Sequence, residues 1–203
     1  MIVCIEGLDG AGKTTQVHML YKHFRSKGVE TTVIPHPDYS SAYGKMIKEY
    51  LHGSEKADVK ALFLTYLADI VKDSEKIRDA DRKGVAILDR YYASTVAYQS
   101  AGGFPYENAK VLVLLLDLPV PDKLFYLDIK PEEAFRRKSA MDTRLDRHEK
   151  DIEFLGKVRQ FYLEQAYDKF PSRWVVFDSM ESKEKIHESI VNEVNKSYKK
   201  LKR

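Results

Sequence analysis

The chain has 203 residues, of which 43% are hydrophobic and 11% aromatic, so it can bury the core of one α/β domain and is not a disordered chain. Its 34 basic and 31 acidic residues give a net charge of +3, too balanced by itself to indicate a nucleic-acid partner. No aliphatic stretch approaches the roughly 20 residues that span a bilayer, and no signal-peptide pattern is visible, so we expect no membrane partner. The single cysteine, Cys4, excludes an internal disulfide, which fits a reducing compartment. We therefore expect one cytoplasmic domain over 1–203.

Strand and helix patterns alternate along the whole chain, which predicts an α/β domain with a mostly parallel sheet. The run around residue 111 is compatible with either a helix or a buried strand, because periodicity alone does not separate them. Apolar runs predict strands at 2–6, 29–34, 85–88, 124–129 and 174–177. Helical spacing predicts helices over 43–51, 59–71 and 186–194 and a short helix around Thr95. One further helix is predicted to end at Gly28, another to begin at Pro131, and a third to end near Tyr167.

The most specific pattern, GxxxxGK[ST], lies between a predicted strand and a predicted helix. Backbone N–H groups of such a loop and the following helix N-terminus converge on phosphate oxygens. Lys13 would add positive charge near the outer phosphates, and we expect its side chain to reach into solvent-filled space. The residues expected to bind the phosphates of ATP are Gly7, Leu8, Asp9, Gly10, Ala11, Gly12, Lys13, Thr14 and Thr15.

Two oxygen ligands are predicted for Mg²⁺. The Thr14 hydroxyl opens the helix after the loop, and Asp89 ends the apolar strand 85–88. Ligands gather at the carboxyl ends of parallel strands, so Asp89 is expected at the same edge of the sheet as the loop. A helix N-cap is the alternative role for Asp89.

A second pattern carries a resemblance to a known family. Segment 89–99, DRYYASTVAYQ, resembles the DRYxxSxxAYQ signature of thymidylate kinases, and segment 6–14 resembles their EGxDGxGKxT loop. Shorter similar segments occur between 118 and 162. The resemblance implies a P-loop fold with a five-stranded parallel sheet, helices on both faces, an arginine-containing lid at about 137–148, and a homodimer. It further implies transfer of the γ-phosphoryl group of ATP to dTMP.

The resemblance also implies roles for single residues. Arg90 would bind the acceptor phosphate through its planar guanidinium, and Asp9 would accept a hydrogen bond from the sugar 3′-hydroxyl. Tyr66 would stack on the base, and Tyr98 would crowd the sugar 2′ position. The residues expected to bind the acceptor are Asp9, Tyr39, Tyr66, Ile70, Arg90, Ser94, Tyr98 and Gln99.

Basic residues cluster in segment 136–147. A solvated charged face is the usual explanation of such a cluster. The phosphate loop, however, has Gly10 where one class of thymidylate kinases has an arginine, which resembles the class whose catalytic arginine comes from the lid. We therefore expect Arg144 and Arg147 to be catalytic and Arg137 to bind ATP.

Two positions depart from the family pattern. Tyr39 stands near the place of an arginine that helps to hold the acceptor phosphate, and Ile70 replaces an arginine that binds the thymine edge. A kinase acting on another monophosphate such as dUMP, or on a nucleoside, therefore remains an alternative. A nucleotide-gated binding module is a second alternative, although Arg90 and Asp9 have no evident role in a switch.

Overall fold

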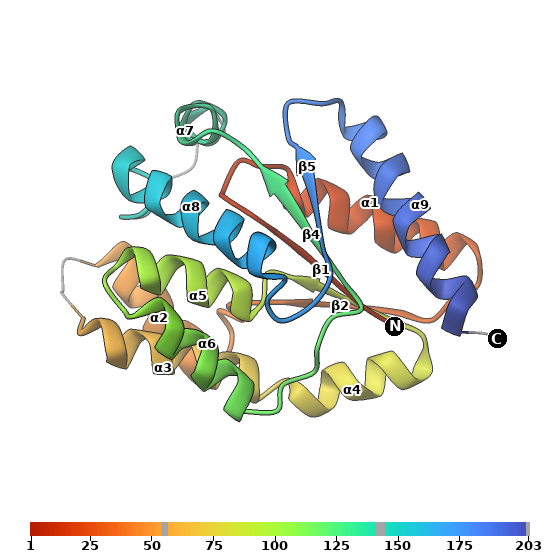
Figure 1. Ribbon diagram of the computed structural model, residues 1–203, viewed down its shortest axis with the longest axis horizontal. Helices are drawn as coiled ribbons and strands as arrows, with labels where there is room; N and C mark the ends of the chain where they lie inside the picture. Colours follow the sequence, from red (N-terminus) through yellow and green to blue (C-terminus); the bar gives the residue numbers. More distant parts are fainter. Residues whose placement is uncertain (54–56, 141–144, 202–203) are drawn as a thin grey trace.

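A five-stranded sheet forms the centre of the computed structural model, which describes residues 1–53, 57–140 and 145–201 (Figure 1). The strands stand in the order β2-β3-β1-β4-β5, and every neighbouring pair is parallel. This confirms the predicted parallel sheet, and it places the carboxyl ends of all five strands at one edge. The strands are β1 (Ile2–Gly7), β2 (Thr31–Pro35), β3 (Val85–Asp89), β4 (Lys123–Asp128) and β5 (Trp174–Asp178).

Helices cover both faces of the sheet, as predicted. Helix α1 (Lys13–Ser26) packs over β1, β2 and β3 and against α9 (Lys183–Leu201). On the opposite face α5 (Tyr92–Ala101) packs against α8 (Ile152–Asp168) (Figure 1). Outside them lie α2 (Ala42–His52), α3 (Val59–Val71) and α6 (Tyr106–Leu115), with α4 (Ser74–Lys83) against β2 and β3 and α7 (Pro131–Ser139) against α8.

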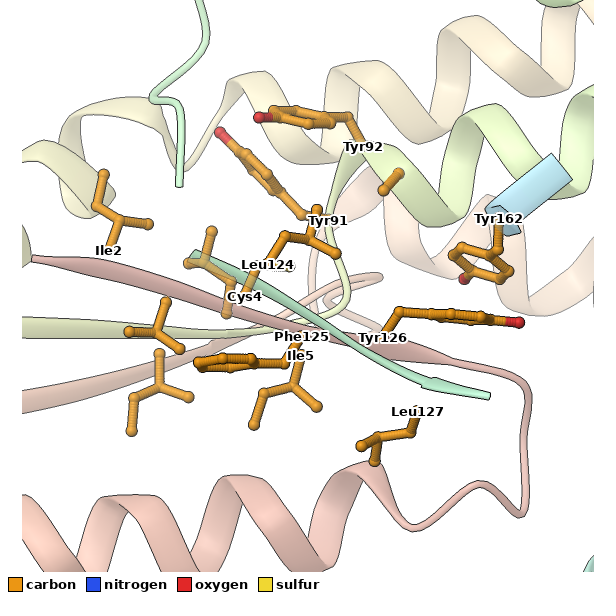
Figure 2. Packing of buried hydrophobic residues seen from close by; sticks show 14 of the residues in the cluster. Ile2, Cys4, Ile5, Tyr91, Tyr92, Leu124, Phe125, Tyr126, Leu127 and Tyr162 are labelled. Atoms are coloured by element: carbon orange, nitrogen blue, oxygen red, sulfur yellow. The ribbon is translucent and has the colours of Figure 1, made fainter. Parts of the chain in front are cut away.

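The core follows from the alternation of side chains along β1 and β4. Figure 2 shows Ile5 and Phe125 on the face toward α1, and Cys4 and Tyr126 on the other face. The Tyr126 ring stacks on Tyr162 of α8 at a centroid distance of 4.8 Å. Cys4 is fully buried and unpaired, so it is a small apolar residue of the first strand, as its position predicts.

The run around residue 111 is helix α6 and not a buried strand, and only Ala109 and Val113 of this helix are buried. The structure differs from the sequence prediction in two other places. Helix α4 is not among the predicted helices, because its polar sequence buries only Ile77 and Ala80. The second strand starts at Thr31, two residues later than predicted. Within the described ranges no helix is both long and apolar enough to cross a membrane.

Candidate active site

The loop between β1 and α1 has a backbone that exposes N–H groups. Gly10 and Gly12 have φ angles of 87° and 95°, which favour glycine. Gly12 is the N-cap residue of α1 and supplies no side-chain cap, so the first N–H groups of this helix are open to an anion. Local geometry therefore agrees with a phosphate-binding loop.

The Lys13 side chain does not reach into solvent, so that expectation is wrong. Lys13 is 6% exposed, and its Nζ donates to the Leu8 carbonyl at 2.9 Å and to Asp9 Oδ1 at 3.3 Å. The physical reason is that a buried ammonium requires acceptors, and the loop provides two. Burial lowers the pKa of Lys13, and the neighbouring Arg90 cation lowers it further, whereas Asp9 opposes both effects.

Thr14 and Asp89 line one hollow between α1 and β2. They offer a hydroxyl and a carboxylate oxygen, which are donors that suit Mg²⁺. In the described part of the chain no group of three or more His, Cys, Asp or Glu side chains could hold a metal by itself. Since Mg²⁺ in kinases takes most of its other ligands from phosphates and water, the two residues fit the ion when ATP supplies the rest.

Arg90 joins the phosphate loop to the adjacent pocket. It directly follows β3, has a φ of 65°, and donates from Nη1 to the Gly7 carbonyl at 2.8 Å and from Nη2 to Asp9 Oδ1 at 2.7 Å. Its Cζ lies 5.6 Å from the centroid of the Tyr98 ring. Burial would raise the pKa of Asp9, but the Arg90 and Lys13 cations lower it below its usual range. Asp9 Oδ2 accepts no hydrogen bond from the described residues and is available to a ligand.

A pocket opens beside Arg90. All eight predicted acceptor-binding residues line it, although they come from four separate parts of the sequence. Tyr66 and Ile70 are one helical turn apart on α3, and three of the predicted residues, Ser94, Tyr98 and Gln99, lie on α5. The lining residues not predicted from the sequence are His36, Pro37, Leu51, Asp69, Tyr91, Thr95, Asp146 and His148.

The signals for these missed residues differ. Tyr91 and Thr95 lie within the segment that resembles the family signature, so their position was visible although their role was not. His148 comes from a distant loop, where its ring stacks on Phe154 at 4.5 Å. His148 lies in a short segment similar to the family, but its place in the pocket depends on tertiary packing.

Tyrosine hydroxyls supply part of the polar lining. The Tyr98 hydroxyl is buried and has no partner among the described residues. Burial raises the pKa of Tyr39 to about 12, with the Arg90 cation opposing the rise. Both hydroxyls therefore stay protonated near neutral pH and can donate hydrogen bonds to a ligand.

Of the arginines in the predicted lid, the described Arg137 and Arg147 are not in the pocket lining. The Arg147 Cζ lies 4.0 Å from the centroid of the Tyr50 ring, and Nη2 donates to the Gly53 carbonyl at 2.7 Å, so this side chain contacts the end of α2. Arg137 donates to Glu133 at 2.7 Å and to the Ser179 carbonyl at 3.2 Å. Arg144 lies outside the described residues.

Comparison with known proteins gives one consistent result. The family model for thymidylate kinase matches residues 5–190. The thymidylate kinase of Caldanaerobacter subterraneus subsp. tengcongensis is 34% identical over 97% of this chain and 96% of its own length, and that of Chlorobium luteolum is 33% identical over 98% and 99%. A solved thymidylate kinase structure from Candida albicans, described as revealing the origin of that enzyme's broad substrate specificity, matches with a TM-score of 0.78 and 29% identity over 97% of this chain and 92% of that one. The similarity therefore includes the phosphate loop, Arg90 and the pocket.

Proposed function

Because the chain belongs to the thymidylate kinase family and transfers the γ-phosphoryl group of ATP to dTMP, we propose that its phosphate loop binds ATP and that the adjacent pocket binds dTMP. The contact that carries this assignment is Arg90, whose guanidinium bonds Gly7 and Asp9 of the loop and also lines the pocket. One cation thus stands between the two proposed phosphate sites. As a kinase, the protein is not merely a nucleotide-gated binding module.

Three side chains have separate proposed roles at this junction. Arg90 would bind the acceptor phosphate, since a guanidinium matches two phosphate oxygens at once. The free Oδ2 atom of Asp9 would accept the hydrogen bond of the sugar 3′-hydroxyl. Lys13 would leave the Leu8 carbonyl for the outer phosphates of ATP, where it stabilises developing negative charge.

Mg²⁺ is the proposed cofactor, held by Thr14 and Asp89 together with phosphate oxygens. The ion supplies positive charge that neutralises the transferred phosphoryl group. ADP release should require both dTMP and Mg²⁺, which a coupled ADP assay with excess EDTA as the control measures. ADP release at the same rate without dTMP would contradict the assignment of the acceptor pocket.

A lid over residues 137–148 is proposed to supply the catalytic arginine. The support comes from Gly10, where an added Cβ would lie 2.7 Å from the Ala134 carbonyl oxygen and the φ of 87° disfavours any other residue. An arginine side chain therefore cannot project from Gly10 unless α7 moves. The catalytic cation must then come from another segment, and the lid has Arg144 and Arg147.

Replacing Arg144 and Arg147 singly by alanine should lower kcat more than it raises KM for ATP. A contact made only in the transition state affects mainly turnover, and such an arginine contributes roughly 10³ to 10⁵ in rate. Steady-state kinetics with saturating dTMP measure both constants, and Arg136→Ala, on the exposed side of α7, is the control. Wild-type kcat in both variants would contradict the catalytic role and indicate that the basic segment 136–147 is a solvated charged surface.

Base selectivity is proposed to be weaker than in relatives with a base-binding arginine, as the broad specificity reported for the Candida albicans enzyme shows to be possible in this family. Tyr66 stacks on any base, and Ile70 offers only apolar contact. Tyr66→Ala should raise KM for dTMP and dUMP by a similar factor, because stacking contributes roughly 1–3 kcal/mol whichever base is bound.

Ile70→Arg should increase the ratio of kcat/KM for dTMP over dUMP and dGMP. An unchanged ratio in a folded Ile70→Arg variant would remove Ile70 from base selection.

A homodimer is proposed from exposed apolar side chains on α3 and α6, both of which pack against α5. Leu64 on α3 is 56% exposed, and Leu115 on α6 is 75% exposed. Exposed apolar side chains that gather in one patch mark protein contacts, and a second copy of the chain would cover Leu64 and Leu115. Light scattering should therefore give twice the mass of one chain, whereas the mass of one chain would contradict the proposal. The cytoplasmic location stays a prediction from the sequence.

A further inference from the structure

A fully buried carboxylate, Glu6, lies next to Arg90 and has no role in the proposed chemistry. Glu6 is the penultimate residue of β1 and is 0% exposed. Burying a carboxylate is costly unless several donors satisfy it. Its hydrogen-bond partners therefore show what the structure gains from it.

One oxygen of Glu6 holds the start of α5. Oε1 accepts hydrogen bonds from the backbone N–H groups of Tyr91 at 2.8 Å and Ser94 at 3.3 Å. Tyr91 is the N-cap residue of α5 and supplies no side-chain cap, so Glu6 caps the helix from the sheet. Because Arg90 immediately precedes this helix, Glu6 also fixes the backbone from which the Arg90 side chain extends.

The other oxygen reaches the Arg90 guanidinium through two hydroxyl groups. Oε2 accepts from Ser94 Oγ at 2.5 Å and from the Tyr162 hydroxyl at 3.1 Å. Arg90 Nη1 in turn donates to the same two oxygens, at 3.2 Å and 3.3 Å. Each hydroxyl therefore bridges the carboxylate and the guanidinium.

The chemistry of these groups fixes the direction of the bonds to the carboxylate and from the guanidinium. An ionised carboxylate only accepts hydrogen bonds and a guanidinium only donates them, so Ser94 and Tyr162 donate to Glu6 and accept from Arg90. The two hydroxyl oxygens also lie 2.7 Å apart, and either can be the donor in that contact. The 2.5 Å contact is typical of a charge-assisted bond to an ionised carboxylate. Burial raises the pKa of Glu6, and the Arg90 cation and the hydroxyl donors oppose that rise.

We propose that Glu6 is a positioning residue that aims Arg90 at the acceptor phosphate, through Ser94, Tyr162 and the first turn of α5. This inference rests on the proposed role of Arg90 in binding that phosphate. Nη1 is held by the two hydroxyls and the Gly7 carbonyl, which leaves Nη2 at the edge shared with Asp9. A neutral side chain in place of Glu6 no longer holds the Ser94 and Tyr162 hydroxyl protons toward itself. The two hydroxyl oxygens then lose the orientation in which they accept hydrogen bonds from Arg90.

Glu6→Gln and Tyr162→Phe test the proposal, because the first removes the charge and the second removes one bridging hydroxyl while keeping the stacked ring. Both should raise KM for dTMP by about tenfold, as expected for lost hydrogen bonds to charged groups, and leave KM for ATP within about twofold. Tyr126→Phe is the matched control: it removes the hydroxyl of the ring that stacks on Tyr162, which bonds neither Glu6 nor Arg90 among the described residues, and it should keep the wild-type KM for dTMP.

A double-mutant cycle with Arg90→Met separates positioning from general loss of structure. In the Arg90→Met background, Glu6→Gln should add almost nothing to KM for dTMP, because the residue through which it acts is already gone. The proposal would be overturned if Glu6→Gln raised KM for dTMP in the Arg90→Met background as much as it does in the wild type. It would also be overturned if the folded single variants raised KM equally for both substrates or left KM for dTMP unchanged. If Glu6→Gln does not fold, Tyr162→Phe decides alone by the same criteria. An unchanged KM in Arg90→Met itself would instead remove the proposed role of Arg90.

Discussion

Lys13→Ala is expected to lower kcat roughly a thousandfold, the largest effect of any single substitution in the phosphate loop. The Lys13 ammonium is buried beside Leu8 and Asp9, where little water screens its charge, so it acts strongly on a phosphoryl group. An interaction made with charge that develops in the transition state changes kcat and not only binding. Single-turnover measurements with saturating ATP and dTMP give the rate of the transfer step directly.

The control for Lys13→Ala is Lys22→Ala, an exposed lysine on the same helix, which should keep wild-type kcat. A thermal melt of each variant shows whether the lost hydrogen bond to the Leu8 carbonyl lowers the melting temperature. If the folded Lys13→Ala variant retains more than about a tenth of kcat, Lys13 has no part in the mechanism.

Arg90→Lys is expected to lower kcat/KM for dTMP about a hundredfold. Lysine keeps the charge but not the planar fork, so it cannot bond Gly7, Asp9 and a phosphate together as the guanidinium can. Hydrogen bonds to charged groups contribute about 1.5–3 kcal/mol each, and the variant loses more than one. Since Arg90 faces the acceptor pocket, KM for ATP should change much less than KM for dTMP.

The matched control for Arg90→Lys is Arg82→Lys on α4, whose side chain is exposed and bonds only to Asp79 among the described residues. Arg82→Lys should have the wild-type kcat/KM for dTMP and the wild-type KM for ATP. Equal losses for ATP and dTMP in Arg90→Lys would argue that Arg90 holds the phosphate loop in shape and does not bind the acceptor.

Features encoded by short segments were predictable from the sequence. Strand β3 is an apolar run that ends at Asp89, and the phosphate loop is a local glycine pattern, so both could be placed without knowing the fold. Tyr66 and Ile70 could be placed on one face of α3 by their spacing. The packing of α3 against α5 then brings them to the pocket beside Arg90.

Features that depend on long-range packing were not predictable. Glu6 opens the segment that resembles the family loop, but its partner Tyr162 is 156 positions away, so only the folded chain shows the buried contact. His148 lies in a segment similar to the family, but that similarity does not show that its ring enters the pocket. Lys13 was expected in solvent, because the spacing of the loop does not show that the Leu8 carbonyl can accept its hydrogen bond.

The close approach of Gly10 to Ala134 also restricts the order in which this enzyme could change over evolutionary time. A substitution at Gly10 meets the Ala134 carbonyl before it can offer any benefit, so an arginine there is harmful as a first step. A displacement of α7 has to come earlier, and by itself it brings no catalytic gain. Under the proposed assignment of the catalytic arginine to the lid, a lineage that starts from this packing cannot transfer that arginine to position 10 while Gly10 and Ala134 remain in contact.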